Sequence, residues 1–223
     1  MWPKSRLKRC FLSIRATPAG ASTPFNPAGY DFPLTDAQSH QVSLTFKVPK
    51  ITCKKADKSG DGINTSISGT TSGDAFDAAG VFLSMSCTGT TASYSIFGIV
   101  DDSNTTSTIP VQAGDVISVA VIASTTFETA SFADSTSGQG SYVDGTGFDA
   151  SLGSVDVQGG NGSGAFPKFN SVTFSQIKLD DKPFSKDAPT GFNQEDSGGN
   201  TQISVGPIST KGTSFVDTYI TNT

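Results

Sequence analysis

The residues of this chain that could do chemistry are mainly carboxylates and hydroxyls, with one histidine and three cysteines. A hydroxyl nucleophile needs a neighbouring base, and His40 is the one imidazole that could serve as that base. The sequence has no Gly-x-Ser-x-Gly turn to expose such a nucleophile. We therefore expect no serine-hydrolase triad and interpret His40 as a structural residue at the start of a strand.

Metal and cofactor sites are not expected either. Zinc needs several His or Cys ligands at short spacing, which the scattered Cys10, Cys53 and Cys87 do not give. Residues 57–62 resemble the start of a calcium loop, with oxygen ligands at positions one, three and five and glycine at six. Its twelfth position is Ser68 rather than glutamate, so we interpret the segment as a polar turn.

The cysteines allow at most one disulfide within the chain, because their number is odd. Cys53 and Cys87 each end a strand-like run, which makes them the plausible pair. Two free buried thiols are the alternative, since a disulfide needs α-carbons within about 7 Å and sequence does not give that distance.

Composition narrows the class of protein. The 223 residues are only 16% charged, with a net charge of -5 and a pI near 4.7. Such an acidic surface repels phosphates, which excludes a nucleic-acid partner. No segment is apolar enough to span a membrane, so no membrane partner is expected. We expect a secreted or extracellular protein working in acid, although residues 1–14 lack the apolar region of a signal peptide.

Alternating apolar and polar residues predict an all-β fold. In residues 41–50, Val42, Leu44 and Phe46 alternate with polar neighbours, which is typical of a half-buried strand. Residues 109–139 predict two strands of one antiparallel sheet, the first buried on both faces or nearly so. Further strands are predicted at residues 63–68, 78–86, 93–100, 142–157, 169–179, 202–205 and 214–220.

Some ten to twelve short strands with turn signals between them indicate a β-sandwich. We predict one sandwich domain over residues 41–223, because no linker divides this part of the chain. Residues 1–40 are rich in proline and are predicted to form an irregular arm.

Two blocks of sequence together resemble the glutamic peptidases, the eqolisin or peptidase G1/A4 family of acid proteases. The first is residues 109–139, where a proline, a turn and a Gly-Asp pair lead into the two predicted strands. The second is residues 166–174, FPKFNSVTF, which is similar to the family's Phe-x-x-Phe-x-x-Val-Thr-Phe strand. The resemblance implies a concanavalin A-like bent antiparallel β-sandwich with a substrate cleft across one sheet.

In that family a glutamate acts as general base on the attacking water, and a glutamine orients the water and stabilises the oxyanion. The resemblance places the glutamine position at Ala78 and the glutamate position at Ser151 or Leu152, so none of the three keeps the family's group. Asp149 is the carboxylate best placed to substitute, and Asp156 is a further option if the strand is shifted.

The cleft implied by the resemblance is also altered. The family's Trp-Val-Gly-Ile-Asp-Gly strand corresponds to residues 64–69, which lack its Trp and its Asp. The residues expected to line the cleft are Asn64, Ser66, Ser68, Tyr94 and Phe97. Glu128, one of only two glutamates, lies in a predicted hairpin turn and is expected to be solvated.

These features predict a divergent homologue of secreted acid glutamic endopeptidases that lacks the catalytic Gln/Glu dyad. It would act as a non-catalytic binding or structural sandwich, with a polypeptide as ligand if the cleft is functional. One alternative is an active acid endopeptidase with a remodelled dyad. A second is a carbohydrate-binding module, which the sequence disfavours because Trp2 is its only tryptophan.

Overall fold

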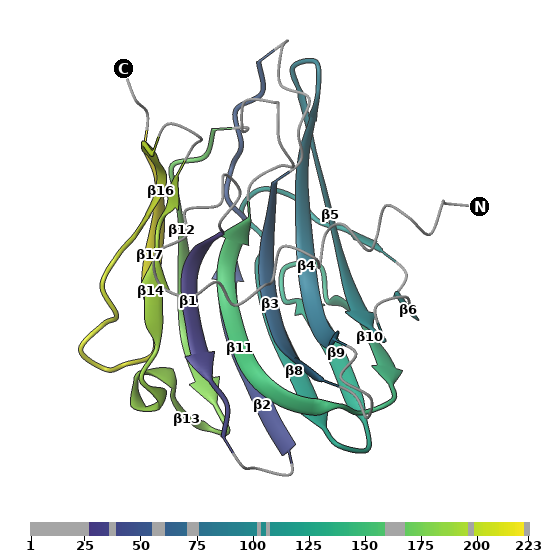
Figure 1. The fold of residues 1–223 in the computed structure, drawn as a ribbon. Helices are drawn as coiled ribbons and strands as arrows, with labels where there is room; N and C mark the ends of the chain where they lie inside the picture. Colours follow the sequence, from purple (N-terminus) through teal and green to yellow (C-terminus); the bar gives the residue numbers. More distant parts are fainter. Residues whose placement is uncertain are drawn as a thin grey trace.

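The computed structural model describes residues 27–35, 39–54, 61–70, 76–101, 104–105, 108–158, 168–195 and 199–220. Its strands form two antiparallel sheets packed face to face, which confirms the predicted sandwich (Figure 1). Within these residues no helix is long and apolar enough to cross a membrane. Cys10, Trp2 and residues 57–60 of the predicted polar turn lie outside the described residues.

Sheet A forms one layer of the sandwich. In spatial order its strands are β14 (Thr190–Phe192), β1 (Ala28–Pro33), β11 (Asp149–Gln158), β3 (Asp61–Thr70), β4 (Phe76–Thr88), β5 (Thr91–Val100) and β6 (Asn104–Thr105), and β7 (Ile109–Pro110) also pairs with β5.

Sheet B forms the other layer. Its order is β10 (Gln139–Gly145), β9 (Glu128–Asp134), β8 (Val116–Ser124), β2 (Ser39–Lys47), β12 (Ser171–Leu179), β17 (Phe215–Tyr219), β16 (Thr201–Val205) and β15 (Gln194–Glu195), and β13 (Lys182–Pro183) also pairs with β12. A single turn of 3-10 helix, η1 (Phe184–Asp187), follows β13.

The apolar alternation seen in the sequence builds the core between the sheets. In β2, Val42, Leu44 and Phe46 point inward and are buried. Strands β8 and β9 form the predicted hairpin between residues 116 and 134. The expectation that the first of them is buried on both faces is wrong for its first half, because the alternate side chains, beginning with Val116, are exposed.

The predicted domain boundary at residue 41 is wrong. Residues 28–33, which were predicted to belong to an irregular arm, form β1 and pair with both β11 and β14. Their sequence, Ala-Gly-Tyr-Asp-Phe-Pro, alternates too briefly between prolines to predict a strand, yet Ala28, Tyr30 and Phe32 pack against the core. The sandwich therefore includes residues 28–33, and β2 begins at Ser39.

A cluster of aromatic rings fills the core near β1 and β17. Phe215 lies at the centre, with ring centroids 4.8 Å from both Tyr30 and Phe174 and 6.0 Å from Phe184. Burying each such ring stabilises the fold by about 1.5–3 kcal/mol. The ring cluster thus attaches β1 and the 3-10 helix to sheet B.

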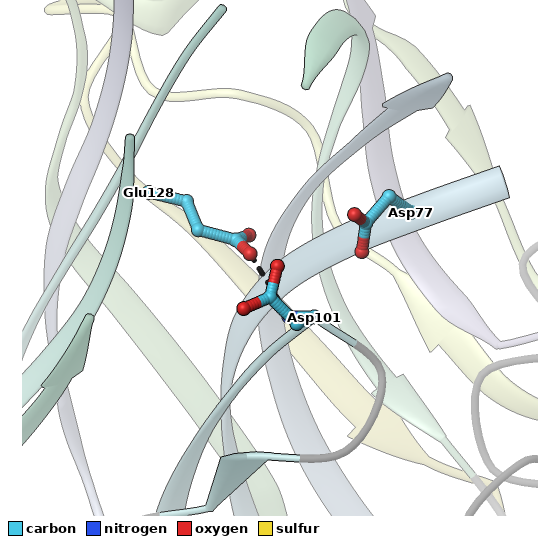
Figure 2. Close-up of side chains that lie close together, drawn as sticks. All are labelled: Asp77, Asp101 and Glu128. Carbon is cyan, nitrogen blue, oxygen red and sulfur yellow. Dashed lines mark hydrogen bonds between the residues drawn. The ribbon is translucent and has the colours of Figure 1, made fainter. Parts of the chain in front are cut away.

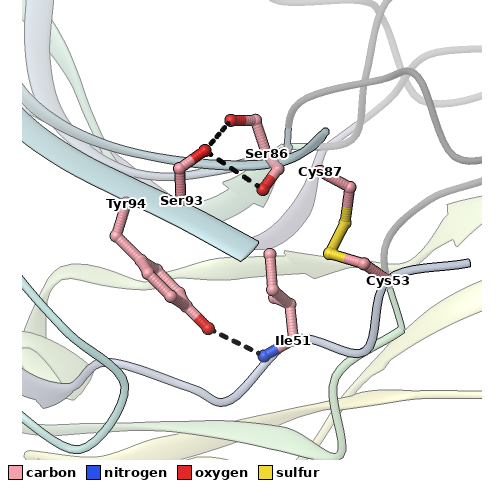
Figure 3. The surroundings of a disulfide bond; sticks show 6 residues. All are labelled: Ile51, Cys53, Ser86, Cys87, Ser93 and Tyr94. Atoms are coloured by element: carbon pink, nitrogen blue, oxygen red, sulfur yellow. Dashed lines mark hydrogen bonds between the residues drawn. A yellow bond between two sulfur atoms is a disulfide. The ribbon is translucent and has the colours of Figure 1, made fainter. Parts of the chain in front are cut away.

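A disulfide joins Cys53 to Cys87, so of the two alternatives that the sequence left open the structure has the bonded pair (Figure 3). Their α-carbons lie 5.6 Å apart. Next to the bond, the hydroxyl of Tyr94 accepts a hydrogen bond from the backbone N–H of Ile51 at 3.1 Å. Together these contacts hold the segment that follows β2 against the ends of β4 and β5.

Candidate functional site

The predicted positions Ala78 and Leu152 fall on the face of sheet A that points away from sheet B. In β4, Ala79, Val81 and Leu83 belong to the core, so the alternation of a strand directs Ala78 to the opposite side. We call this side the outer face. It presents side chains from β1, β11, β3, β4 and β5.

A cross-strand row on the outer face brings the predicted positions together. Ala78 is paired with Ser68 of β3, and Ser68 is paired with Leu152 of β11. Directly paired residues point to the same face, and two strand spacings separate Ala78 from Leu152 by roughly 10 Å. The register of β11 shifts between Ala150 and Leu152, which leaves Ser151 unpaired with β3 and exposed. Leu152 is therefore the position in line with Ala78.

Asp149, the predicted substitute carboxylate, is not in this row. It pairs with Thr70, beyond the irregularity in β11, and its side chain is exposed. Two residues separate Asp149 from Leu152, and only the first of them, Ala150, is paired with β3. The irregularity therefore places Asp149 and Leu152 on the same face. Asp149 thus lies at the margin of the outer face rather than beside Ala78.

The half of the outer face over β4 and β5 is apolar. Ala78 and Ile99 are buried together, and Phe97 packs against them. The Phe97 ring also contacts Phe82, with centroids 5.5 Å apart. Both phenylalanines keep part of their surface exposed. Phe97 therefore lies beside Ala78 on the outer face.

The half over β1, β11 and β3 is polar. The amide of Asn64 donates hydrogen bonds to the carboxylate of Asp156 and to the hydroxyl of Ser66, both at 3.1 Å. The hydroxyl of Ser154 donates to the carboxylate of Asp31 at 2.6 Å. Burial raises the pKa of Asp31, and the hydrogen bond from Ser154 partly offsets that rise.

This polar half contains a carboxylate and a carboxamide, the two groups of the family's dyad, but in a different arrangement. Asp156 and Asn64 contact one another directly and are each about 2% exposed. A water-activating pair needs its two groups far enough apart to hold the water between them. In the contact observed here Asn64 and Asp156 are bonded to one another directly at 3.1 Å, which leaves no room for a water between them.

The other predicted site residues are placed as follows. Asn64, Ser66 and Ser68 are on the outer face with Phe97, whereas Tyr94 points to the other side of β5 and packs against the core. Tyr94 and Phe97 are an odd number of residues apart, which puts them on opposite faces of a strand.

His40 is buried in β2, where its Nδ1 lies 3.0 Å from the carboxylate of Asp180. That contact agrees with the structural role expected of this histidine.

A second group of carboxylates, missed by the sequence reasoning, lies between the sheets at one end of the sandwich. Asp77 comes from β4, Asp101 follows β5 and Glu128 begins β9 (Figure 2). The expectation that Glu128 is solvated is wrong: it is 0% exposed, because position 128 is the first inward-facing residue of β9. Burial, with the Asp101 and Asp77 carboxylates nearby, raises the pKa of Glu128 to about 9.

The chain belongs to the peptidase A4 family, whose family model matches residues 26–206. Among solved structures it is similar to scytalido-glutamic peptidase with a peptide-based transition-state analogue, at 17% identity and a TM-score of 0.64 over 89% of this chain and 100% of that one. SCP-B, an eqolisin in complex with the tripeptide Ala-Ile-His, gives 16% and 0.63 over the same shares.

Aspergilloglutamic peptidase from Aspergillus niger is similar at 20% identity and a TM-score of 0.55, over 72% of this chain and 99% of that chain. No curated protein matches the sequence. At these identities the structural likeness shows a shared fold.

Proposed function

We propose that this chain is a non-catalytic member of the peptidase A4 family that binds extended polypeptide on the outer face of sheet A. The observation that carries the proposal is the row formed by Ala78, Ser68 and Leu152. Resemblance to the family puts the catalytic glutamine and glutamate at its two ends. A methyl group and a leucine side chain can neither take a proton from water nor stabilise an oxyanion.

The apolar half of the outer face supports a polypeptide as the ligand. Phe82 and Phe97 are half-buried rings that pack against one another and offer their remaining surface to an apolar side chain. Two of the similar structures hold peptide-like ligands. Sugar-binding faces instead need rings that are open enough to stack on a pyranose, which favours peptide over the carbohydrate alternative.

We also propose that the protein is secreted. The Cys53–Cys87 disulfide supports this location, because such bonds persist in oxidising compartments. The low content of charged residues and the pI near 4.7 agree with work in an acidic exterior.

Catalysis is tested by incubating the purified protein with unfolded casein at pH 3 to 5, with and without pepstatin. We expect no cleavage, because no carboxylate occupies the Ala78–Leu152 row. The double variant Ala78→Gln/Leu152→Glu provides the matched comparison and is expected to gain slow, pepstatin-insensitive cleavage. Cleavage by the unmodified protein would contradict the proposal.

Binding is tested by titrating a fluorescent peptide of unfolded casein into the protein. Phe97→Ala should weaken binding about tenfold or more, since a truncated aromatic anchor typically costs above 1 kcal/mol. Tyr142→Ala is the control, because Tyr142 is a 67% exposed ring on β10 of sheet B. Equal affinities for the two variants would place the ligand elsewhere.

The second candidate function is an active acid endopeptidase, favoured by the contact between Asp156 and Asn64. Substrate binding would have to separate the two side chains and admit a water. This candidate predicts pepstatin-insensitive casein cleavage that Asp156→Asn abolishes and Asp149→Asn leaves intact. The same casein assay therefore separates the two functions.

A further inference from the structure

Three carboxylates, one from β4, one from the residue after β5 and one from β9, meet between the two sheets at the end of β4 where Asp77 lies. One carboxylate oxygen each from Asp77, Asp101 and Glu128 can be chosen such that all three lie within 4.8 Å of one another. Asp77 and Glu128 are buried and Asp101 is half-buried. Like charges at such separations repel by several kcal/mol away from bulk water. The group therefore needs protons or a cation.

An orphaned oxygen within the group points to a ligand. Oε1 of Glu128 accepts a hydrogen bond from the backbone N–H of Asp101 at 2.9 Å. Its other oxygen, Oε2, is buried and accepts no hydrogen bond. A buried acceptor left without a donor costs about 1–3 kcal/mol. Figure 2 shows the Glu128 carboxylate directed at Asp101.

The backbone around the group leaves space at the carboxylates and orients one of them. A side chain on Gly145 would place its β-carbon 2.6 Å from both Oδ2 of Asp101 and Oε1 of Glu128. The N–H of Thr146 donates to both oxygens of Asp101 at 3.2 Å. Glycine at 145 thus keeps open the space next to two of the three carboxylates, while its neighbour fixes Asp101.

We propose that Asp77, Asp101 and Glu128 bind a hard divalent cation of the size of Ca²⁺. All three ligands are carboxylate oxygens, which suit Ca²⁺, Mg²⁺ and Mn²⁺ rather than thiophilic metals. Two oxygens that bind Ca²⁺ at about 2.3–2.6 Å can be as far as roughly 5 Å apart, which the observed spacing satisfies. Mg²⁺ requires its ligands within about 4.2 Å and a near-ideal octahedron.

The cation would connect the two sheets and reach the neighbourhood of Ala78. Asp77 and Glu128 belong to sheets A and B, so a shared ion ties the first residues of β4 and β9 together. Oδ1 of Asp77 also accepts a hydrogen bond from the N–H of Ala78 at 2.8 Å. Cation binding is thereby coupled to the position of the strand that carries the family's glutamine site.

Protons compete with the cation for the same oxygens. A carboxylate binds a cation in its ionised form, so the affinity of the site for the cation should rise with pH. The groups that face Glu128 here are Asp101 and Asp77, both carboxylates, which add to this competition.

The experiment is a calorimetric titration of Ca²⁺ into the chelator-treated full chain at pH 8, paired with thermal unfolding. We expect one Ca²⁺ per chain and a melting temperature raised by about 5–10 °C at a Ca²⁺ concentration a hundredfold above Kd. Glu128→Gln should weaken binding at least tenfold, whereas the exposed Asp149→Asn should bind as the unmodified chain does.

Gly145→Ala separates geometry from charge, because it keeps all three carboxylates but fills the adjacent space. It should also lose at least tenfold in Ca²⁺ affinity, with an unchanged β-sheet circular dichroism spectrum. No Ca²⁺-dependent rise in the melting temperature of the unmodified chain at pH 8 would overturn the proposal and leave protons as the occupants. Unchanged affinity in Glu128→Gln would overturn it as well, and equal Mg²⁺ affinity would overturn the size assignment.

Discussion

The two ends of β9 carry buried carboxylates on the same face of the strand, and their pKa values are shifted in opposite directions. Glu128 at the start receives one backbone N–H and faces two other carboxylates, and its pKa is raised to about 9. Asp134 at the end receives the N–H groups of Thr136 and Ser137 and the hydroxyl of Ser137, at 2.8, 3.3 and 2.6 Å. Burial pushes the pKa of Asp134 up, but these donors outweigh burial and lower it.

Both side chains are at most 1% exposed, so burial alone does not decide their charge state. The number of donors does, because each N–H or O–H stabilises the ionised form. Asp217 of β17 extends the comparison: it is 0% exposed and neither of its oxygens has a hydrogen-bond partner. Burial, with a smaller contribution from the charge of Asp156, raises its pKa to about 9.

The largest expected effect is a fall in stability with rising pH. Glu128 and Asp217 keep a proton in the folded state at pH values where the unfolded chain has lost it. Between about pH 4 and 9 the free energy of unfolding should therefore fall, by about 1.4 kcal/mol per pH unit for each full proton. As the pH is lowered below about 4, the free energy of unfolding should decrease as well, because the pKa of Asp134 is lowered in the folded state and its protonation there is unfavourable.

Urea denaturation in EDTA at pH 3 to 9 measures this profile. Asp217→Asn should make the decline between about pH 4 and 9 less steep, by the contribution of about one proton. A maximum of stability near pH 7, or an Asp217→Asn profile parallel to that of the unmodified chain, would contradict the assignment.

A smaller effect separates the two ends of β9 directly. Glu128→Gln removes a carboxyl that must keep its proton in the folded state, and should stabilise the metal-free protein at pH 8 by about 1–2 kcal/mol, a value reduced by screening at the half-buried Asp101. Asp134→Asn removes the negative charge that three hydrogen bonds stabilise and replaces one of the two acceptor oxygens with an NH₂ group, and should destabilise by about 1–3 kcal/mol at pH 7. Thermal unfolding in EDTA measures both, and shifts of the same sign would refute the contrast.

The smallest expected effect isolates one donor. Ser137→Ala removes the hydroxyl that donates to Asp134 and leaves both backbone donors in place. The pKa of Asp134 should rise toward its ordinary value, with a loss of about 1 kcal/mol at pH 7. Carbon-detected NMR titration of the Asp134 carboxyl measures the pKa, and an unchanged value would mean that the backbone N–H groups suffice.

Much of the sandwich could be predicted because one face of each long strand is buried. The alternation of Val42, Leu44 and Phe46 and the hairpin of β8 and β9 follow from that rule. Strand β1 was missed because its six residues are bounded by prolines and packed by aromatic rings far away in sequence. Its pairing with β11 and β14 is a tertiary property that local pattern does not encode.

The resemblance to the family assigns Ala78 and Phe97 to the candidate site, and the alternation of a strand puts both on the outer face. The sequence left the choice between Ser151 and Leu152 open, because it depends on an irregularity in β11 that no residue type predicts. The sequence did not predict the group of Asp77, Asp101 and Glu128, because its three members are far apart in the chain and only the fold brings them together. Glu128 in particular follows a turn, where solvation is the ordinary expectation.

Strand β4 is linked to the opposite layer at both of its ends, and only one of the two links is covalent. At Cys87 the link is covalent and reaches the segment after β2 of sheet B. At Asp77 the link is the carboxylate group shared with Glu128 of β9. The first link holds under any pH, while the second depends on what neutralises the carboxylates. We therefore expect separation of the two sheets to start at Asp77 rather than at Cys87.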